Sequence, residues 1–374
     1  MAGIYIHIPY CKQACHYCDF HFSTHLKTKP QLLKALLNEI EIQADYLFNN
    51  PIDSIYFGGG TPSILSPEEL DKIFQSINKH HNISEGAEVT LEANPDDLSK
   101  KKLRSLYSLG VNRLSIGIQS FDDKILTLFN RAHNARMATD SVKNARDIGF
   151  ENISVDLIFG LPDQTVDHFQ TDLMKIIDLE TEHVSIYGLT IEEKTVFGKW
   201  SKSKKINLPN EEVSAQQFEL IMDGLSSAGF DQYEISNFCR KGYESKHNSS
   251  YWDQKPYLGI GPGAHSYNGN SRQFNIPNNA NYIKSISKGE LPCDIEHLSA
   301  LDKYNEYILT KLRTKQGVDI DYMLTYFSQD LLTNRKTKIE QFEENGLVEI
   351  DNYLRLTRKG RLIADSITES LIEV

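Results

Sequence analysis

Three cysteines near the start of the chain have a spacing that suits a metal site. Cys11, Cys15 and Cys18 form a Cys-x3-Cys-x2-Cys pattern directly after a short apolar run. Thiolates are soft ligands that suit zinc and iron–sulfur clusters. The two remaining cysteines, Cys239 and Cys293, are isolated and have no partner at ligand spacing. The pattern therefore predicts a metal centre with three protein thiolates.

Structural zinc and disulfide bonds account for this pattern less well than an iron–sulfur cluster. Structural zinc has four Cys or His ligands, and the sequence has no second knuckle to complete such a site. The cysteine count of five is odd, and no secretion signal precedes the pattern. Iron–sulfur clusters normally have four thiolates, so three would leave one iron open to an exchangeable ligand. A metal ion or cluster that has only a structural role stays open as the alternative.

The composition limits the partners and the location that we expect. The chain has 374 residues, 40% of them hydrophobic and 24% charged, as in ordinary globular proteins of one to three domains. A net charge of −11 argues against broad nucleic-acid binding, which needs a positive face. No apolar run approaches the ~18 residues of a membrane span, and no export signal is visible. We therefore expect a cytoplasmic protein with reduced thiols and neither a nucleic-acid partner nor a membrane span.

Short apolar runs alternate with amphipathic helical patterns over the first half of the chain. The runs cover 4–8, 54–57, 88–92, 113–118, 153–159 and 184–189, and the helical patterns cover 31–47, 67–80, 99–109, 135–148 and 166–179. This alternation predicts an α/β fold of βα units around a parallel sheet. Six units are too few for a closed barrel of eight, so we expect a partial (β/α)6 barrel. Its working face should be the C-terminal ends of the strands.

Polar residues and a glycine-rich turn stand at or near the ends of these predicted strands. They are Gly59, Gly60, Thr61, Glu92, Gln119, Arg131 and Asp156. Taken singly, each is consistent with a plain turn or a surface residue. Asp156 differs because it lies inside an apolar strand, where an unpaired carboxylate is costly to bury. Together these residues supply donors and acceptors that suit a polar, zwitterionic nucleoside ligand.

Residues 233–281 are rich in Tyr, Gly and Asn and show few periodic signals. Within them, His247 opens the run His-Asn-Ser-Ser-Tyr-Trp, and an imidazole suits haem iron. The Tyr and Trp of this run could line a flat apolar ligand, and a loop packed by its own aromatic side chains is the alternative. We interpret Gly259, Gly261 and Gly263 as backbone packed close to a ligand.

The last part of the chain resembles a winged helix. Helical patterns at 299–313, 319–326 and 331–345 precede a hairpin of 347–350 and 353–356 and a last helix from 358. From residue 298 onward there are 11 basic and 13 acidic residues, which favours a docking or lid role over DNA binding. We expect three domains: a barrel (1–205), a connector with the His247 motif (206–297) and a winged-helix-like α+β domain (298–374).

Together these motifs resemble the radical S-adenosylmethionine (SAM) superfamily, in particular the HemW-type haem chaperones of its coproporphyrinogen dehydrogenase-like branch. The resemblance covers nearly the whole chain and rests on the cysteine pattern, GGGTPS, LEANP, NRLSIGIQSF, NISVDLIFGLPDQT, HNSSYW and GIGPGAHS. It implies that Cys11, Cys15 and Cys18 hold a 4Fe–4S cluster whose open iron binds SAM. The carbonyls and amides of the glycine turn would receive the SAM amino group. The implied SAM contacts are Tyr5, Tyr17, Gly59, Gly60, Thr61, Glu92, Gln119, Arg131 and Asp156, and His247 would interact with haem.

Phe20 distinguishes the two main functions within this branch. The bacterial coproporphyrinogen dehydrogenases carry a further cysteine two residues after the third ligand, where this chain has Phe20. This difference and HNSSYW favour a haem chaperone that passes haem to haemoproteins, including membrane-associated ones. Oxygen-independent coproporphyrinogen III oxidation is the alternative, followed by a non-enzymatic metal or interaction protein. The sequence identifies no catalytic residue and leaves SAM turnover open.

Overall fold

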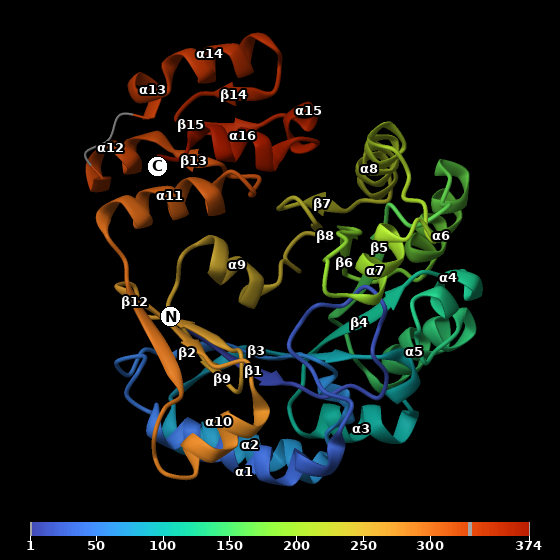
Figure 1. Ribbon diagram of the computed structural model, residues 1–374, viewed down its shortest axis with the longest axis vertical. Helices are drawn as coiled ribbons and strands as arrows, with labels where there is room; N and C mark the ends of the chain where they lie inside the picture. Colours follow the sequence, from blue (N-terminus) through green and yellow to red (C-terminus); the bar gives the residue numbers. More distant parts are fainter. Residues whose placement is uncertain (1, 328–330, 374) are drawn as a thin grey trace.

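The computed structural model describes residues 2–327 and 331–373, and a large mixed sheet dominates them (Figure 1). Six parallel strands lie side by side in sequence order at its centre. They are β1 (Ala2–Ile8), β2 (Ile52–Gly59), β3 (Ile83–Ala93), β4 (Arg113–Gln119), β5 (Ile153–Phe159) and β6 (His183–Gly188). This arrangement confirms the predicted partial (β/α)6 barrel.

Helices between these strands cover the outer face of the sheet. They are α1 (Lys29–Ile42), α2 (Pro67–His80), α3 (Lys100–Ser108), α4 (Asp123–Leu128), α5 (Ala135–Ile148) and α6 (Val166–Asp178). The apolar faces of α1, α2, α3, α5 and α6 form one core with the strands, mainly of Ile, Leu, Val and Phe side chains. Ile125 of α4 packs instead in a small separate cluster with Phe129 and Phe197. The limits of α2 follow from local chemistry, because Ser66 and Glu69 form a reciprocal capping box and Pro67 occupies the first turn.

The sheet continues beyond both edges of the barrel, which the sequence does not predict. On one side β9 (Tyr257–Ile260) pairs in parallel with β1, and three antiparallel strands follow. They are β10 (His265–Tyr267), β11 (Ser271–Asn275) and β12 (Cys293–His297). On the other side β8 (Asn237–Cys239) and β7 (Asp231–Gln232) extend β6. The helices of this region are α7 (Val196–Lys202), α8 (Glu211–Ser227), α9 (Lys246–Trp252) and α10 (Asn279–Ile286).

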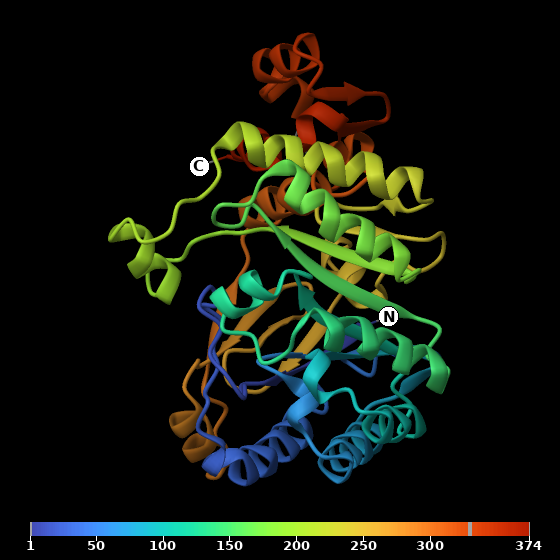
Figure 2. The same cartoon turned by 90° about the vertical axis from the view of Figure 1, so that its right-hand side faces the viewer.

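The C-terminal part has a hydrophobic core of its own and lies at the opposite end of the molecule from α1 and α2 (Figure 2). A sheet of order β13-β15-β14 packs among its helices, as expected for a winged-helix-like fold. The elements are α11 (Ala300–Lys311), β13 (Val318–Asp319), α12 (Ile320–Phe327), α13 (Leu331–Asn334), α14 (Lys336–Glu344), β14 (Val348–Ile350), β15 (Tyr353–Leu356), α15 (Arg358–Arg361) and α16 (Ala364–Leu371). The predicted domain boundaries after residues 205 and 297 stay predictions. Residues 1, 328–330 and 374, which belong to the first and third predicted domains, lie outside the described residues.

No helix in the described ranges is long and apolar enough to cross a membrane.

Gly259 in β9 and Gly261 just after it contact protein backbone, so our interpretation that they face a ligand is corrected for these two glycines. A Cβ at Gly259 would clash with the carbonyl group of His265. A Cβ at Gly261 would lie 2.6 Å from the carbonyl oxygen of His7, and the Gly261 amide donates to the buried carboxylate of Glu39 at 2.8 Å. These glycines therefore allow two backbone segments to approach each other.

We predict that Gly259→Ala lowers the free energy of unfolding by about 2–3 kcal/mol, because the new Cβ overpacks the contact with the backbone of His265. Gly269→Ala is the matched control, since a Cβ there meets open space and only the positive φ of +93° resists it. That control should cost about 1 kcal/mol. Urea unfolding of both variants measures the difference, and equal destabilisation would contradict the packing argument.

Candidate functional site

The three cysteines lie on the loop that leaves the C-terminal end of β1. Backbone hydrogen bonds hold this loop: the Cys11 amide donates to the Ser23 carbonyl at 3.1 Å, and the Cys18 amide donates to the Cys15 carbonyl at 3.3 Å. All three thiols are free and partly exposed, and they line one cavity of about 450 Å³. The loop therefore presents the three sulfurs to the mouth of the barrel.

The donor set of the cysteine loop fits a cluster better than a single ion. In the described ranges, no three His, Cys, Asp or Glu side chains are close enough to hold one metal ion. A cubane cluster binds each thiolate at a different iron, so its ligands do not need to converge on one point. Burial raises the pKa of the Cys18 thiol to about 12, and a bound metal would displace that proton. The Arg131 guanidinium donates to the Cys15 sulfur at 3.5 Å.

The amides of the glycine turn after β2 all have hydrogen-bond partners within the protein. The amides of Gly59, Gly60 and Thr61 donate to the Glu92 carboxylate and to the carbonyls of Ile8 and Tyr10, at 3.2, 2.9 and 2.8 Å. The expectation that these amides take part in receiving an amino group is therefore corrected, and the part expected of the carbonyls stays a prediction. A Cβ at Gly60 would lie within 2.8 Å of the backbone of Ile8 and Tyr10, so this turn requires glycine.

Glu92 is the carboxylate at the end of β3, and two donors hold it. The Tyr56 hydroxyl donates to its Oε1 at 2.8 Å, and the Gly59 amide donates to its Oε2 at 3.2 Å. Burial raises the pKa of Glu92 to about 7, and the two hydrogen bonds act in the opposite direction. The group can therefore accept hydrogen bonds as a carboxylate near or above neutral pH.

Asp156 and Gln119 complete the polar ring on the next two strands. Burial raises the pKa of Asp156 to about 6, while the hydroxyl of Ser115 donates to its carboxylate at 3.3 Å. Gln119 has a φ of +70°, an unusual value for a residue other than glycine, at an irregular point of the β4–β5 pairing. Strained backbone of this kind is concentrated at ligand sites.

The structure brings most of the predicted residues to one cavity. Its lining includes the three cysteines and eight of the nine other residues expected around the nucleoside. These eight are Tyr17, Gly59, Gly60, Thr61, Glu92, Gln119, Arg131 and Asp156. Tyr5 and His247 do not line the cavity.

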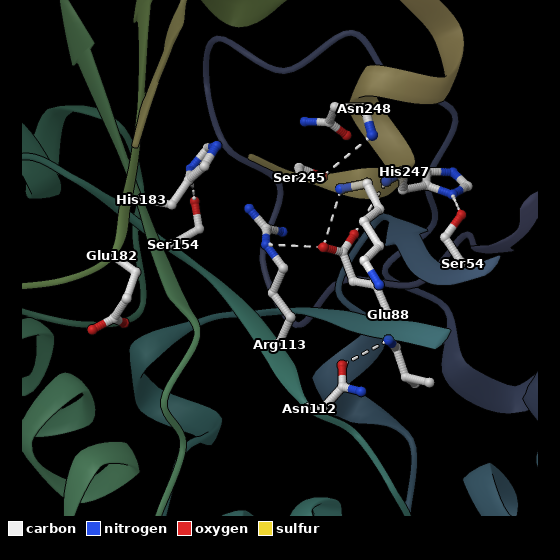
Figure 3. Close-up of polar contacts among 12 residues, drawn as sticks. Ser54, Glu88, Asn112, Arg113, Ser154, Glu182, His183, Ser245, His247 and Asn248 are labelled. Atoms are coloured by element: carbon white, nitrogen blue, oxygen red, sulfur yellow. Dashed lines mark hydrogen bonds and ion pairs between the residues drawn. The ribbon is translucent and has the colours of Figure 1, made fainter. Parts of the chain in front are cut away.

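His247 lies in the protein interior on α9, and both its ring nitrogens have partners, of which Figure 3 shows Ser54. Only 1% of its surface is exposed. Nδ1 lies 2.9 Å from the Ser54 hydroxyl, and Nε2 lies 2.9 Å from the Tyr251 hydroxyl. Burial lowers the pKa of His247 to about 3, so the ring is neutral.

Several residues that line the cavity are not among those predicted from the sequence. Tyr56, Asn94, Arg113 and Tyr187 line the same space. The alternation along β2, with Ser54, Tyr56 and Gly58 on one side, is the signal that could have identified Tyr56. Arg113 has no comparable signal: its side chain is 1% exposed, and its Nε lies 4.0 Å from Glu88.

Comparisons with known proteins identify the family. The profile of the Radical SAM superfamily matches residues 5–176, and that of the HemN C-terminal domain matches residues 298–363. The chain is 37% identical over 372 residues to "Heme chaperone HemW" of Bacillus subtilis, covering 98% of both chains. It belongs to the HemW family. A Lactococcus lactis HemW is 33% identical and covers 98% of this chain and 96% of its own.

Relatives of this chain include an animal protein, and a solved structure shares the fold. A mitochondrial "Radical S-adenosyl methionine domain-containing protein 1" of Danio rerio is 31% identical, covering 99% of this chain and 87% of its own. The solved coproporphyrinogen III oxidase HemN of Escherichia coli superposes with a TM-score of 0.86 at 22% identity, covering 99% of this chain and 90% of that one. At that identity the likeness shows the fold alone.

We predict that Tyr56→Phe raises the pKa of Glu92 further above about 7, because the phenol hydrogen bond stabilises the ionised carboxylate. Carbon-13 NMR titration of labelled glutamate carboxyls measures the change. Tyr46→Phe is the control, since the buried Tyr46 hydroxyl has no hydrogen-bond partner in the described structure. An unchanged Glu92 titration in Tyr56→Phe would contradict the assigned hydrogen bond.

Proposed function

We propose that this protein is a haem chaperone that binds haem and transfers it to haemoproteins. The observation that carries the proposal is the similarity over 98% of the chain to relatives named "Heme chaperone HemW". Phe20 supports it, because it replaces the further cysteine expected in coproporphyrinogen dehydrogenases. We also propose that the protein acts in the cytoplasm, that its acceptors include membrane-associated haemoproteins, and that residues 298–374 dock partners or act as a lid.

The proposed cofactors are a 4Fe–4S cluster on Cys11, Cys15 and Cys18 and SAM in the adjoining cavity. When bound, the cluster would supply an open iron that chelates the amine and carboxylate of SAM. The cavity volume of about 450 Å³ and its polar ring support a nucleoside ligand of this size. Whether SAM is consumed is left out of the proposal.

Each side of the cavity would bind a different part of SAM. Carbonyl groups of the glycine turn would accept hydrogen bonds from the N–H bonds of the SAM amino group, because the amides of that turn are already used. Glu92 and Asp156 would accept hydrogen bonds from the ribose hydroxyls as carboxylates. Gln119, Arg131 and Tyr17 would complete the lining, and Tyr5 would contribute from behind the cavity wall.

Phe20 and His247 are the residues that we propose for haem. Phe20 is 69% exposed and lines the mouth of the cavity beside the cysteines, which suits contact with a flat apolar ring. His247 would interact with haem only after its ring leaves Ser54 and Tyr251. Because both nitrogens are bonded in this structure, haem ligation by His247 requires its side chain to rotate or α9 to move.

We predict that the wild-type protein binds haem and that His247→Ala weakens this binding at least tenfold, through loss of an iron ligand or of the helix that carries it. Titration of reconstituted protein with haem, followed by visible absorbance, measures the difference. His183→Ala is the matched control, because His183 is equally buried and is bonded to Ser154 and Tyr233 in the same way. Equal, weak binding by wild type and His247→Ala would remove the chaperone proposal.

The second candidate is oxygen-independent coproporphyrinogen III oxidation, in which two propionate side chains are oxidised and each loses carbon dioxide. The specific observation in its favour is that the three cysteines and the polar ring meet at one cavity. Reconstituted protein would be incubated anaerobically with coproporphyrinogen III, SAM and a reductant. Formation of protoporphyrinogen would support this function, and its absence would count against it.

A further inference from the structure

The helix that carries HNSSYW is docked into the barrel by its first turn. The Glu88 carboxylate accepts hydrogen bonds from the backbone amides of Lys246 and His247, each at 3.1 Å (Figure 3). The buried guanidinium of Arg113 lies 4.0 Å from the same carboxylate. The start of α9 is therefore fixed against β3 and β4, and the helix packs on β1 and β2.

From this docked position the His247 ring forms one wall of the space that holds Tyr56. The two rings stack with centroids 4.9 Å apart at an angle of 23°. The Tyr5 ring lies on Tyr56 as well, with a centroid distance of 6.1 Å at 26°. Tyr56 is buried and has few alternative positions while both rings are in place.

Tyr56 connects this packing to the candidate site. Its hydroxyl donates to Glu92 at 2.8 Å, and Glu92 in turn accepts the amide of Gly59 at 3.2 Å. His247 therefore stands two contacts from a carboxylate that lines the cavity, although His247 itself does not line it. Loss of its ring would leave space beside Tyr56, and a small shift of the phenol would weaken its bond to Glu92.

We propose that His247 is a positioning residue that holds Glu92 in place for SAM through Tyr56. The proposal rests on the SAM site of the proposed function, and it gives the HNSSYW motif a role besides haem. Ser54 and Tyr251 fix the ring by one hydrogen bond each, so the neutral imidazole acts by shape and orientation and not by charge.

Dissociation constants for SAM in anaerobically reconstituted protein test this inference. We expect His247→Ala to weaken SAM binding at least tenfold, because a carboxylate hydrogen-bonded to the ligand is displaced. His183→Ala removes a buried histidine with the same kinds of partners at 2.8 Å and should leave SAM affinity within about twofold. In a Tyr56→Phe background, His247→Ala should add little further loss, since the connecting hydroxyl is already absent.

A shape-preserving variant separates positioning from simple loss of structure. The triple variant His247→Phe, Ser54→Ala, Tyr251→Phe keeps an aromatic ring against Tyr56. It also removes the two hydroxyls that would lose their partner together with the imidazole. It should restore most of the SAM affinity that His247→Ala loses. Wild-type affinity in His247→Ala, an equal loss in His183→Ala, or no recovery in the triple variant would overturn the inference. Absence of SAM binding by the wild type would instead remove the proposed SAM site on which the inference rests.

Discussion

Glu92 is packed among protein groups and also lines the cavity, and much of the barrel end follows from this constraint. An ionised carboxylate is costly to bury unless donors surround it. Tyr56 and the amide of Gly59 supply those donors. Gly59 has a φ of +104°, and a Cβ there would lie 2.5 Å from the His7 ring, so this donor requires glycine. The Tyr56 donor requires a packed ring beside it, which α9 supplies.

Parallel topology explains why residues far apart in sequence share one cavity. Each central strand ends at the same edge of the sheet, so the cysteine loop, the glycine turn, Glu92 and Gln119 converge there. The added strand β9 continues this order beside β1 and brings the second half of the chain to the barrel. The same connection places α9 on the inner side of β1 and β2, where its histidine reaches Tyr56.

Local patterns are sufficient to predict the central fold and most of the cavity. The periodicity predicts helices at 67–80 and 135–148, and α2 and α5 have these limits because caps and apolar faces act locally. The edge strands have only two to five residues, too few for a periodic signal. The surroundings of His247 depend on Ser54, which is 193 positions away, and no local pattern reports such a contact. The HNSSYW motif alone therefore could not show that the His247 ring is buried and bonded within the protein.

The carboxylate of Glu92 is the group at which the SAM site proposed for this member of the HemW family can be tested most directly. If this carboxylate binds SAM beside the cysteine loop, removing its charge should lower the affinity for SAM without disturbing the fold. The most direct measurement is the SAM dissociation constant of reconstituted Glu92→Gln and wild type at pH 8, above the Glu92 pKa of about 7. We expect at least tenfold weaker binding by the variant, because charge-assisted hydrogen bonds to the ligand are lost. Equal affinities would contradict it.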